Sequence, residues 1–325
     1  MYSIINIITS KNPNLFFTKL VLILGIILAL IILYKITKPP VEKIEGFTQK
    51  EPFVLKNNEN IYDDFYVDIY DELYETKKRI QKELVQVLKM TEPTAKYSSF
   101  LDIGSGTGYT VDQLTKAGYK AYGIDKSEEM VKYSENRYPE SEYLCGDVLD
   151  PMTFENSSFT HILCTNLTFY LLDNKMAFFN NCYFWLKPNG YLVLHLVNRH
   201  KFSIYKPVAR KPLHNFPSKT PPPRITNTNV DFDDFKYTSS YQFPKNKSDK
   251  SSTEEIVFKE KFVDKETKHV RENEQTLYMD SISTIIKMAN KAGFTLKGNL
   301  DMVNVVKKGP YADRFQFIYI FERSM

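Results

Sequence analysis

The residues whose types and spacing suit chemistry begin at Asp102, where an apolar segment runs into closely spaced glycines. Phe100-Leu-Asp-Ile is followed by Gly104-Ser-Gly-Thr-Gly108, and a second acid, Asp125, comes about 20 residues further on. Glycines in such a loop let the backbone approach a ligand closely. An acid at that spacing can accept hydrogen bonds from both hydroxyls of a ribose. The pattern therefore predicts a site for a ribose-containing ligand.

Two features of this loop favour S-adenosylmethionine over a dinucleotide. Asp102 beside the loop would repel a pyrophosphate, whereas it would stabilise a cationic group such as a sulfonium or an α-ammonium. The third glycine is Gly108, whereas the dinucleotide fingerprint needs a glycine at the next position, which is Tyr109 here. The residues alone therefore indicate S-adenosylmethionine as the cofactor.

The elements that must position this loop alternate between strands and helices from residue 61 onward. Strands are predicted over 99–103, 121–125, 143–145, 161–165 and 191–197, and helices over 61–90, 109–117, 127–138 and 174–186. After a β-rich insertion over about 200–276, with strands over 235–243, 256–263 and 270–279, the pattern resumes with a helix over 281–292 and strands over 294–300 and 315–321. The fold class is therefore α/β, a doubly wound, mainly parallel seven-stranded sheet that binds ligands at its carboxyl edge.

Five motifs in order resemble those of the class I S-adenosylmethionine-dependent methyltransferase superfamily. They are Leu101-Asp-Ile-Gly-Ser-Gly-Thr-Gly108, Gly123-Ile-Asp125, Cys145-Gly-Asp-Val148, Thr160-His-Ile-Leu-Cys-Thr-Asn166 and Leu186-Lys-Pro-Asn-Gly-Tyr-Leu-Val193. The resemblance implies a Rossmann-like methyltransferase fold. In it, Asp125 would bind the ribose, Asp147 the adenine amino group, and Met130 would flank the adenine. The implied cofactor-binding set is Asp102, Gly104, Ser105, Gly106, Gly108, Asp125, Lys126, Met130, Asp147, Val148 and Asn166.

Catalytic residues are harder to predict because methyl transfer needs proximity and orientation more than a dedicated base. His200 follows the fifth strand at the ligand-facing end, and it is a candidate base or an exposed loop residue. Tyr66 lies between Tyr62 and Tyr70 on one face of the first helix, where these phenols would meet the ligands or pack on the sheet. The three cysteines include no C-x-x-C pair, so neither a disulfide framework nor a metal site is predicted.

The N-terminal segment predicts a membrane anchor over 15–35, between a tail over 1–14 and a polar linker over 36–60. Its aliphatic run has no polar face and no following cleavage site, which argues against a core helix and a signal peptide. More lysines follow the run than precede it, which favours a cytosolic catalytic domain over 61–325 on a single-pass membrane protein. The basic, proline-rich stretch 199–228 would meet anionic lipid head groups or form a solvated loop.

Taken together, the sequence predicts a membrane-tethered methyltransferase whose acceptor is a lipid, a quinone-like molecule or a membrane protein. An inactive binding or scaffold protein of the same fold is the alternative. A nucleic-acid methyltransferase is disfavoured because the formal net charge is only +4 and because Asn166-Leu-Thr-Phe lacks the Pro-Pro pair of many such enzymes. The oligomeric state and the acceptor atom are not determined by the sequence.

Overall fold

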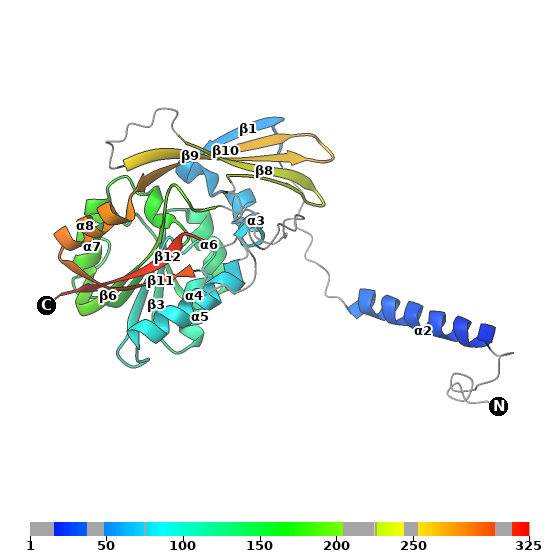
Figure 1. Ribbon diagram of the computed structural model, residues 1–325, viewed down its shortest axis with the longest axis horizontal. Coiled ribbons are helices and arrows are strands. Elements are labelled where there is room, and N and C mark those ends of the chain that lie inside the picture. Colours follow the sequence, from blue (N-terminus) through cyan, green and yellow to red (C-terminus); the bar gives the residue numbers. More distant parts are fainter. Residues whose placement is uncertain are drawn as a thin grey trace. The chain divides into compact units, whose positions relative to one another are not determined.

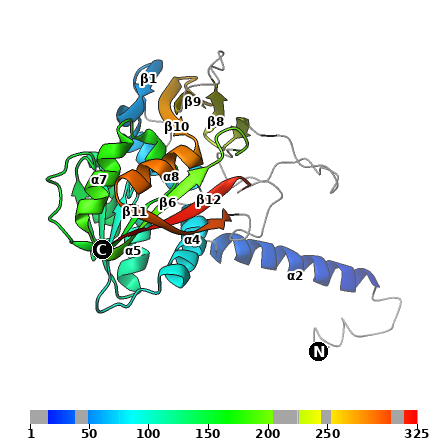
Figure 2. The same cartoon turned by 60° about the vertical axis from the view of Figure 1, so that its left-hand side comes forward.

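The computed structural model divides the chain into two compact units, Met1–Gly46 and Phe47–Met325. Figures 1 and 2 show the chain from two directions. The structure describes residues 16–37, 49–74, 76–203, 224, 226–243, 253–302 and 314–324. The predicted tail 1–14, part of the predicted linker 36–60 and most of the basic stretch 199–228 lie outside the described residues.

The N-terminal unit contains helix α2 (Phe16–Thr37), which forms where the sequence places its aliphatic run. Within the described ranges, no helix is long and apolar enough to cross a membrane. The transmembrane anchor predicted over 15–35 is therefore not supported, and neither is the membrane location that was deduced from it.

A seven-stranded mixed sheet forms the centre of the second unit, with the strand order β11-β12-β6-β5-β2-β3-β4. Five strands run parallel to one another: β2 (Ser99–Ile103), β3 (Lys120–Asp125), β4 (Glu142–Cys145), β5 (Phe159–Cys164) and β6 (Leu186–Val197). Strand β12 (Gln316–Arg323) lies antiparallel between β6 and β11 (Phe294–Asp301). The predicted sheet of seven strands is confirmed. The strands that follow β2 in the chain are added first on one side of it (β3, β4) and then on the other (β5, β6).

Helices connect these strands and cover both faces of the sheet (Figure 2). They are α4 (Thr76–Thr91), α5 (Tyr109–Lys116), α6 (Glu128–Arg137), α7 (Lys175–Trp185) and α8 (Ile282–Lys291). The starts of α6, α7 and α8 are capped because the side chains of Ser127, Asn174 and Ser281 each accept a hydrogen bond from a backbone N–H of the first turn.

The helix predicted over 61–90 corresponds to two described helices, α3 (Asp64–Tyr74) and α4, and residue 75 between them lies outside the described residues. The two helices pack on different partners. Leu84 and Val87 of α4 join the cluster around Phe100 of the central sheet. Tyr66 of α3 instead contacts Phe262 of a second sheet, with ring centroids 6.4 Å apart.

The second sheet has five strands in the order β1-β10-β9-β8-β7. They are β1 (Phe53–Asn57), β7 (Asn227–Asp231), β8 (Phe235–Gln242), β9 (Thr253–Asp264) and β10 (Val270–Asp280). Strand β1 pairs parallel with β10, and the other neighbours are antiparallel. Strands β8, β9 and β10 correspond to the three strands expected in the insertion, whereas β1 forms inside the stretch expected to be a linker.

The two sheets share one hydrophobic core. Ile256, Phe258 and Met279 of the second sheet belong to the same buried cluster as Trp185 of α7 and Ile285 of α8. Because the cluster is continuous, the second sheet is held against the carboxyl edge of the central sheet, above α3 in Figure 1.

Candidate active site

A cavity of about 320 Å³ opens at the carboxyl ends of β2 and β3. Its wall is formed by the loops that follow β2, β3 and β4, by residues of α3 and α6, by the short helix η3 (Thr168–Leu171), and by β10 with the turn η2 (Asn58–Ile61) that follows β1. The lining includes Asn58, Glu59, Tyr62, Tyr70, Gly104, Gly106, Asp125, Lys126, Met130, Asp147, Val148, Thr168, Leu171, Leu172, Asp173, Gln275, Thr276 and Tyr278. The cavity therefore lies where a doubly wound sheet binds its ligand.

The glycine loop after β2 brings bare backbone to this cavity. Gly104 and Gly106 have φ values of +66° and +53°, a region that side chains with a Cβ rarely adopt. A Cβ on Gly104 would lie only 2.4 Å from Cγ2 of Thr168. Gly104 is thus required both by its backbone conformation and by the close approach of η3.

Asp125 ends β3 and is fixed beside the glycine loop by backbone donors. Its Oδ2 accepts a hydrogen bond from the Gly106 N–H at 2.9 Å, and its Oδ1 accepts one from the Ser127 N–H at 3.0 Å. Burial raises the pKa of the Asp125 carboxyl, and these N–H groups offset part of that effect. The carboxylate is therefore held in one orientation, with lone pairs left for a ligand.

Beyond Asp125 the cavity wall is formed by an ion-pair cluster and two apolar side chains. Lys126 Nζ lies 3.0 Å from Glu59 Oε2 and 3.3 Å from Asp147 Oδ2, and these contacts raise the pKa of the lysine. Met130 and Val148 are buried beside them. This part of the wall therefore offers an apolar surface bordered by charged groups.

Asp102 is buried directly beneath the glycine loop, and it does not line the cavity. The residue is only 3% exposed, and its Oδ1 has no hydrogen-bond partner. The pKa of Asp102 is raised to about 7, mainly by burial and in part by the charges of Asp125 and Glu83, although a hydrogen bond from the Thr110 side chain acts in the opposite direction. A buried acid of this kind is suited to stabilising a cation bound at the loop.

Three other residues of the expected cofactor set lie behind the cavity wall. Gly108 caps α5 with φ +81°, and a Cβ there would lie 2.6 Å from the Tyr143 hydroxyl. The Ser105 side chain packs against Gly123 and its Oγ has no partner. Asn166 has φ +50° and leads into η3. These residues shape the loops rather than line the cavity.

The tyrosines of α3 divide between two environments. Tyr62, just before the helix, and Tyr70 line the cavity, and the Tyr62 hydroxyl lies 3.0 Å from Nε2 of Gln275. Tyr66 is buried outside the cavity, where its hydroxyl donates a hydrogen bond to Glu260 Oε2 at 2.7 Å. The structure therefore brings Tyr62 and Tyr70, but not Tyr66, to the candidate site.

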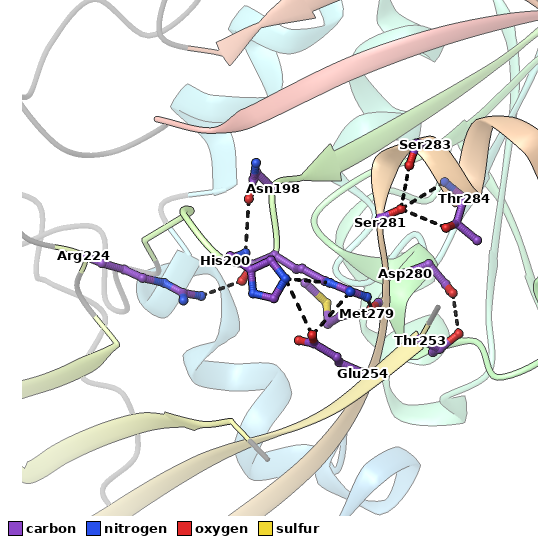
Figure 3. Close-up of polar contacts among 11 residues, drawn as sticks. Asn198, His200, Arg224, Thr253, Glu254, Met279, Asp280, Ser281, Ser283 and Thr284 are labelled. Atoms are coloured by element: carbon purple, nitrogen blue, oxygen red, sulfur yellow. Dashed lines mark hydrogen bonds and ion pairs between the residues drawn. The ribbon is translucent and has the colours of Figure 1, made fainter. Parts of the chain in front are cut away.

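His200 also lies away from the cavity lining. Figure 3 shows its ring next to Glu254 in a cluster that joins the end of β6 to β9 and β10. His200 Nε2 accepts a hydrogen bond from Arg199 Nε at 3.1 Å and lies 3.6 Å from Glu254 Oε1, and its side chain is 55% exposed. The arrangement places His200 as a surface residue of this cluster.

No sequence pattern predicted the cavity wall that faces the glycine loop. Gln275, Thr276 and Tyr278 reach the cavity from β10, and Thr168 and Leu172 reach it from η3 and the residue after it. The alternation of polar and apolar residues predicted β10 as a strand, but nothing local shows that its middle would cover a site more than 150 residues earlier in the chain.

Two observations indicate that the residues of this site suit S-adenosylmethionine. The glycine loop offers a cradle that a Cβ on Gly104 would fill, and the buried Asp102 has an unpartnered carboxylate oxygen next to that loop. The first accommodates a close-packed ligand, and the second suits a positively charged one.

Comparisons with known proteins agree with this fit. Residues 101–194 match a family described as a methyltransferase domain. A malonyl-[acyl-carrier protein] O-methyltransferase of Halalkalibacterium halodurans is 27% identical over 155 residues, which cover 45% of this chain and 54% of that protein. A phosphoethanolamine N-methyltransferase of Plasmodium falciparum is 29% identical over 161 residues, which cover 46% of this chain and 58% of that protein. The chain thus spans just over half the length of these curated relatives.

Among solved structures, an S-adenosylmethionine-dependent methyltransferase of Clostridium acetobutylicum has the same fold. The TM-score is 0.58 at 16% identity, and the match covers 80% of this chain and 98% of that chain. The family match marks residues 101–194 as a methyltransferase domain, and its fold is that of S-adenosylmethionine-dependent methyltransferases. Its cofactor is S-adenosylmethionine.

Proposed function

We propose that this protein transfers a methyl group from S-adenosylmethionine to a small-molecule acceptor bound between η3 and β10. When bound, the cofactor supplies an electrophilic methyl group on a positively charged sulfur. The observation that carries the proposal is that one cavity joins Gly104 and Asp125 to Gln275 and Tyr278 of the second sheet. Groups for a cofactor and for an acceptor therefore face the same enclosed space.

On the cofactor side, the residues that line the cavity take the roles that the resemblance to S-adenosylmethionine-dependent methyltransferases implies. The backbone of Gly104 and Gly106 receives the methionine end, and Asp125 accepts hydrogen bonds from the ribose hydroxyls. Asp147 accepts from the adenine amino group, and Met130 packs on the adenine ring. The hydrogen bond from the Gly106 N–H to Asp125 supports this assignment, because it holds the carboxylate assigned to the ribose next to the glycine loop.

On the acceptor side, the wall combines aromatic and aliphatic side chains with polar ones. Tyr62, Tyr70, Leu172 and Tyr278 provide the apolar surface, and the polar groups come from Thr168, Asp173, Gln275 and Thr276. Burial raises the pKa values of Tyr62 and Tyr70, so their hydroxyls stay protonated and donate hydrogen bonds instead of acting as bases. Such a wall excludes water and holds an acceptor close to the methyl group, which are the main requirements of the reaction.

Calorimetric titration of the full chain with S-adenosylmethionine tests the cofactor half of the proposal. Asp125→Asn should weaken binding about 10- to 100-fold, because it removes charge-assisted hydrogen bonds. Asp150→Asn is the matched control, since Asp150 is an exposed acid in the turn just after Asp147 and does not line the cavity. No binding by the wild-type chain, or equal effects of the two variants, would contradict the proposal.

Methyl transfer itself is tested with cofactor labelled in its methyl group. The full chain is incubated with a cell extract separated into small molecules, lipids, proteins and nucleic acids. Transfer of label to the small-molecule fraction, and its loss in the Asp125→Asn variant, is the expected result. Label found only in protein, lipid or nucleic acid would refute a small-molecule acceptor, and no label in any fraction would favour an inactive protein of this fold.

A further inference from the structure

The charged side chains of the cavity are unevenly divided between its two sides. Among the described lining residues, Lys126 is the only basic one, and its Nζ lies 3.0 Å from Glu59 Oε2 and 3.3 Å from Asp147 Oδ2 on the cofactor side. The acceptor side is lined by aromatic, aliphatic and neutral polar side chains and by one acid, Asp173. This side therefore carries a negative charge and, within the described part of the chain, no positive one.

Asp173 lies just before helix α7. The residue is exposed, and its Oδ1 accepts a hydrogen bond from the Asn174 N–H at 2.6 Å. None of the ion pairs among the described residues includes Asp173. The cation closest to it in the chain, Lys175, is buried 3.1 Å from Asp280 Oδ2 and also donates to two backbone carbonyl oxygens. Because Asp280 balances the charge of Lys175, the Asp173 carboxylate is left to pair with a ligand.

Aromatic rings line the same side of the cavity. Tyr62 and Tyr70 reach it from the segment that includes α3, and Tyr278 reaches it from β10. The ring of Tyr70 stacks on Tyr74, with centroids 4.3 Å apart. The Tyr62 hydroxyl accepts a hydrogen bond from Gln275 Nε2 at 3.0 Å. An ammonium group is attracted by the face of an aromatic ring as well as by a carboxylate, so the acceptor side combines two kinds of group that bind organic cations.

We propose that the methyl acceptor is a small basic amine, bound as an ammonium ion between Asp173 and the tyrosine rings of the acceptor side. The inference rests on the proposed function and names the chemical class of its acceptor. A carboxylate or phosphate would meet Asp173 without a described counter-charge, so the site disfavours anionic acceptors. A neutral alcohol would gain no charge interaction from Asp173.

Methyl transfer to such an acceptor balances with the loss of one proton. An alkylamine, like a lysine side chain, is protonated at neutral pH and then has no lone pair to donate. The bound amine therefore releases one proton to water before it reacts. Its lone pair forms the bond to the methyl carbon, the carbon–sulfur bond breaks, and the electron pair of that bond stays on sulfur. The methylated amine leaves as an ammonium ion once it has been released to water.

Turnover with pools of small molecules sorted by charge tests the inference. A cell extract freed of macromolecules is separated at about pH 7 into molecules retained by a sulfonate resin, molecules retained by a quaternary ammonium resin, and molecules retained by neither. Each pool is incubated with the full chain and S-adenosylmethionine, and the S-adenosylhomocysteine formed above a blank without enzyme is measured by mass spectrometry. The sulfonate-retained pool, which contains the amines, should give at least about tenfold more product than either of the other pools.

Two variants test the role of Asp173. Asp173→Asn should raise the amount of the sulfonate-retained pool needed for half-maximal rate about five- to tenfold, because it removes the charge but keeps the Oδ1 that accepts from Asn174. Its calorimetric affinity for S-adenosylmethionine should stay within about twofold of wild type, which shows that the variant is folded. Asp150→Asn is the matched control. Asp150 is also an exposed acid whose Oδ1 accepts a hydrogen bond from a nearby backbone N–H, that of Met152, yet it does not line the cavity.

The inference is wrong if the neutral or the anionic pool gives most of the product, or if Asp173→Asn has no larger effect than Asp150→Asn. If Asp173→Asn does not fold, the three pools on the wild-type chain decide the question alone. Product from none of the pools would instead refute the small-molecule acceptor of the proposed function, so the two failures are distinguishable.

Discussion

A buried ion pair holds the second sheet to the central domain beside the cavity. Lys175, the first residue of α7, is 3% exposed and its Nζ lies 3.1 Å from Asp280 Oδ2, whose side chain is 2% exposed. The same ammonium donates hydrogen bonds to the carbonyl oxygens of Leu172 and Tyr278, both at 2.9 Å. All three of its donors are therefore used, and they connect α7, the end of η3 and β10. Leu172 and Tyr278 are also cavity residues.

Replacing Lys175 by methionine should destabilise the fold by about 3–5 kcal/mol, the usual loss when one partner of a buried pair is removed. Two charges 3.1 Å apart attract by about 5 kcal/mol at an effective dielectric constant of about 20. Part of that attraction offsets the desolvation of the ammonium, and burial does lower the pKa of Lys175. The variant then leaves Asp280 as an unpaired buried carboxylate and two carbonyl groups without a donor, which explains the large expected loss.

Urea unfolding, followed by the fluorescence of Trp185, measures this loss. Trp185 is the only tryptophan of the chain and is fully buried at the other end of the same helix, α7. Lys261→Met is the matched control, because Lys261 pairs with Glu272 at 2.9 Å on the second sheet but is 46% exposed. It should cost less than about 1 kcal/mol. The reasoning would be refuted if the free energy of unfolding of the Lys175→Met variant lay within about 1 kcal/mol of the wild-type value.

Three further outcomes follow from other residues. Burial lowers the pKa of His161 from 6.5 to about 4, so the unfolded chain binds a proton in that range while the folded chain does not. Stability should therefore fall by up to about 3 kcal/mol as the pH drops through this window, and urea unfolding of His161→Gln should show a flatter profile. Gly104→Ala should weaken cofactor binding at least about tenfold by calorimetry, since its Cβ would meet Thr168. His200→Ala should leave that affinity within about twofold, because the exposed ring lies outside the cavity lining.

The central sheet could be predicted because its signals are local. The strand Ser99–Ile103 is buried at every position and mainly apolar, and it leads directly into the glycines, so both its bounds and the loop were predicted from residues close together in the chain. Strand β1 was missed for the opposite reason. Its five residues, Phe-Val-Leu-Lys-Asn, become a strand by pairing with β10, which lies more than 200 residues later.

The site divides in the same way between local and distant information. The spacing of Tyr62, Tyr66 and Tyr70 predicted three phenols on one face of a helix, yet only the fold decides which of them meets the cavity. Tyr66 turns to Glu260, a partner 194 residues away that bonds to Tyr237 as well. Glu260 does not belong to any recognisable sequence motif. The sequence therefore offered no means to distinguish Tyr66 from Tyr62 and Tyr70.

The N-terminal edge of the second sheet is part of the site and not a linker to it. Asn58 Oδ1 accepts a hydrogen bond from the Thr276 N–H at 2.9 Å, which continues the pairing of β1 with β10 up to the cavity. The next residue, Glu59, reaches Lys126, which in turn contacts Asp147 on the opposite wall. Because the cavity is closed by segments that precede and follow the central sheet, a domain boundary at residue 61 would remove two lining residues. The unit that carries the methyltransferase site must therefore include the residues from β1 onward.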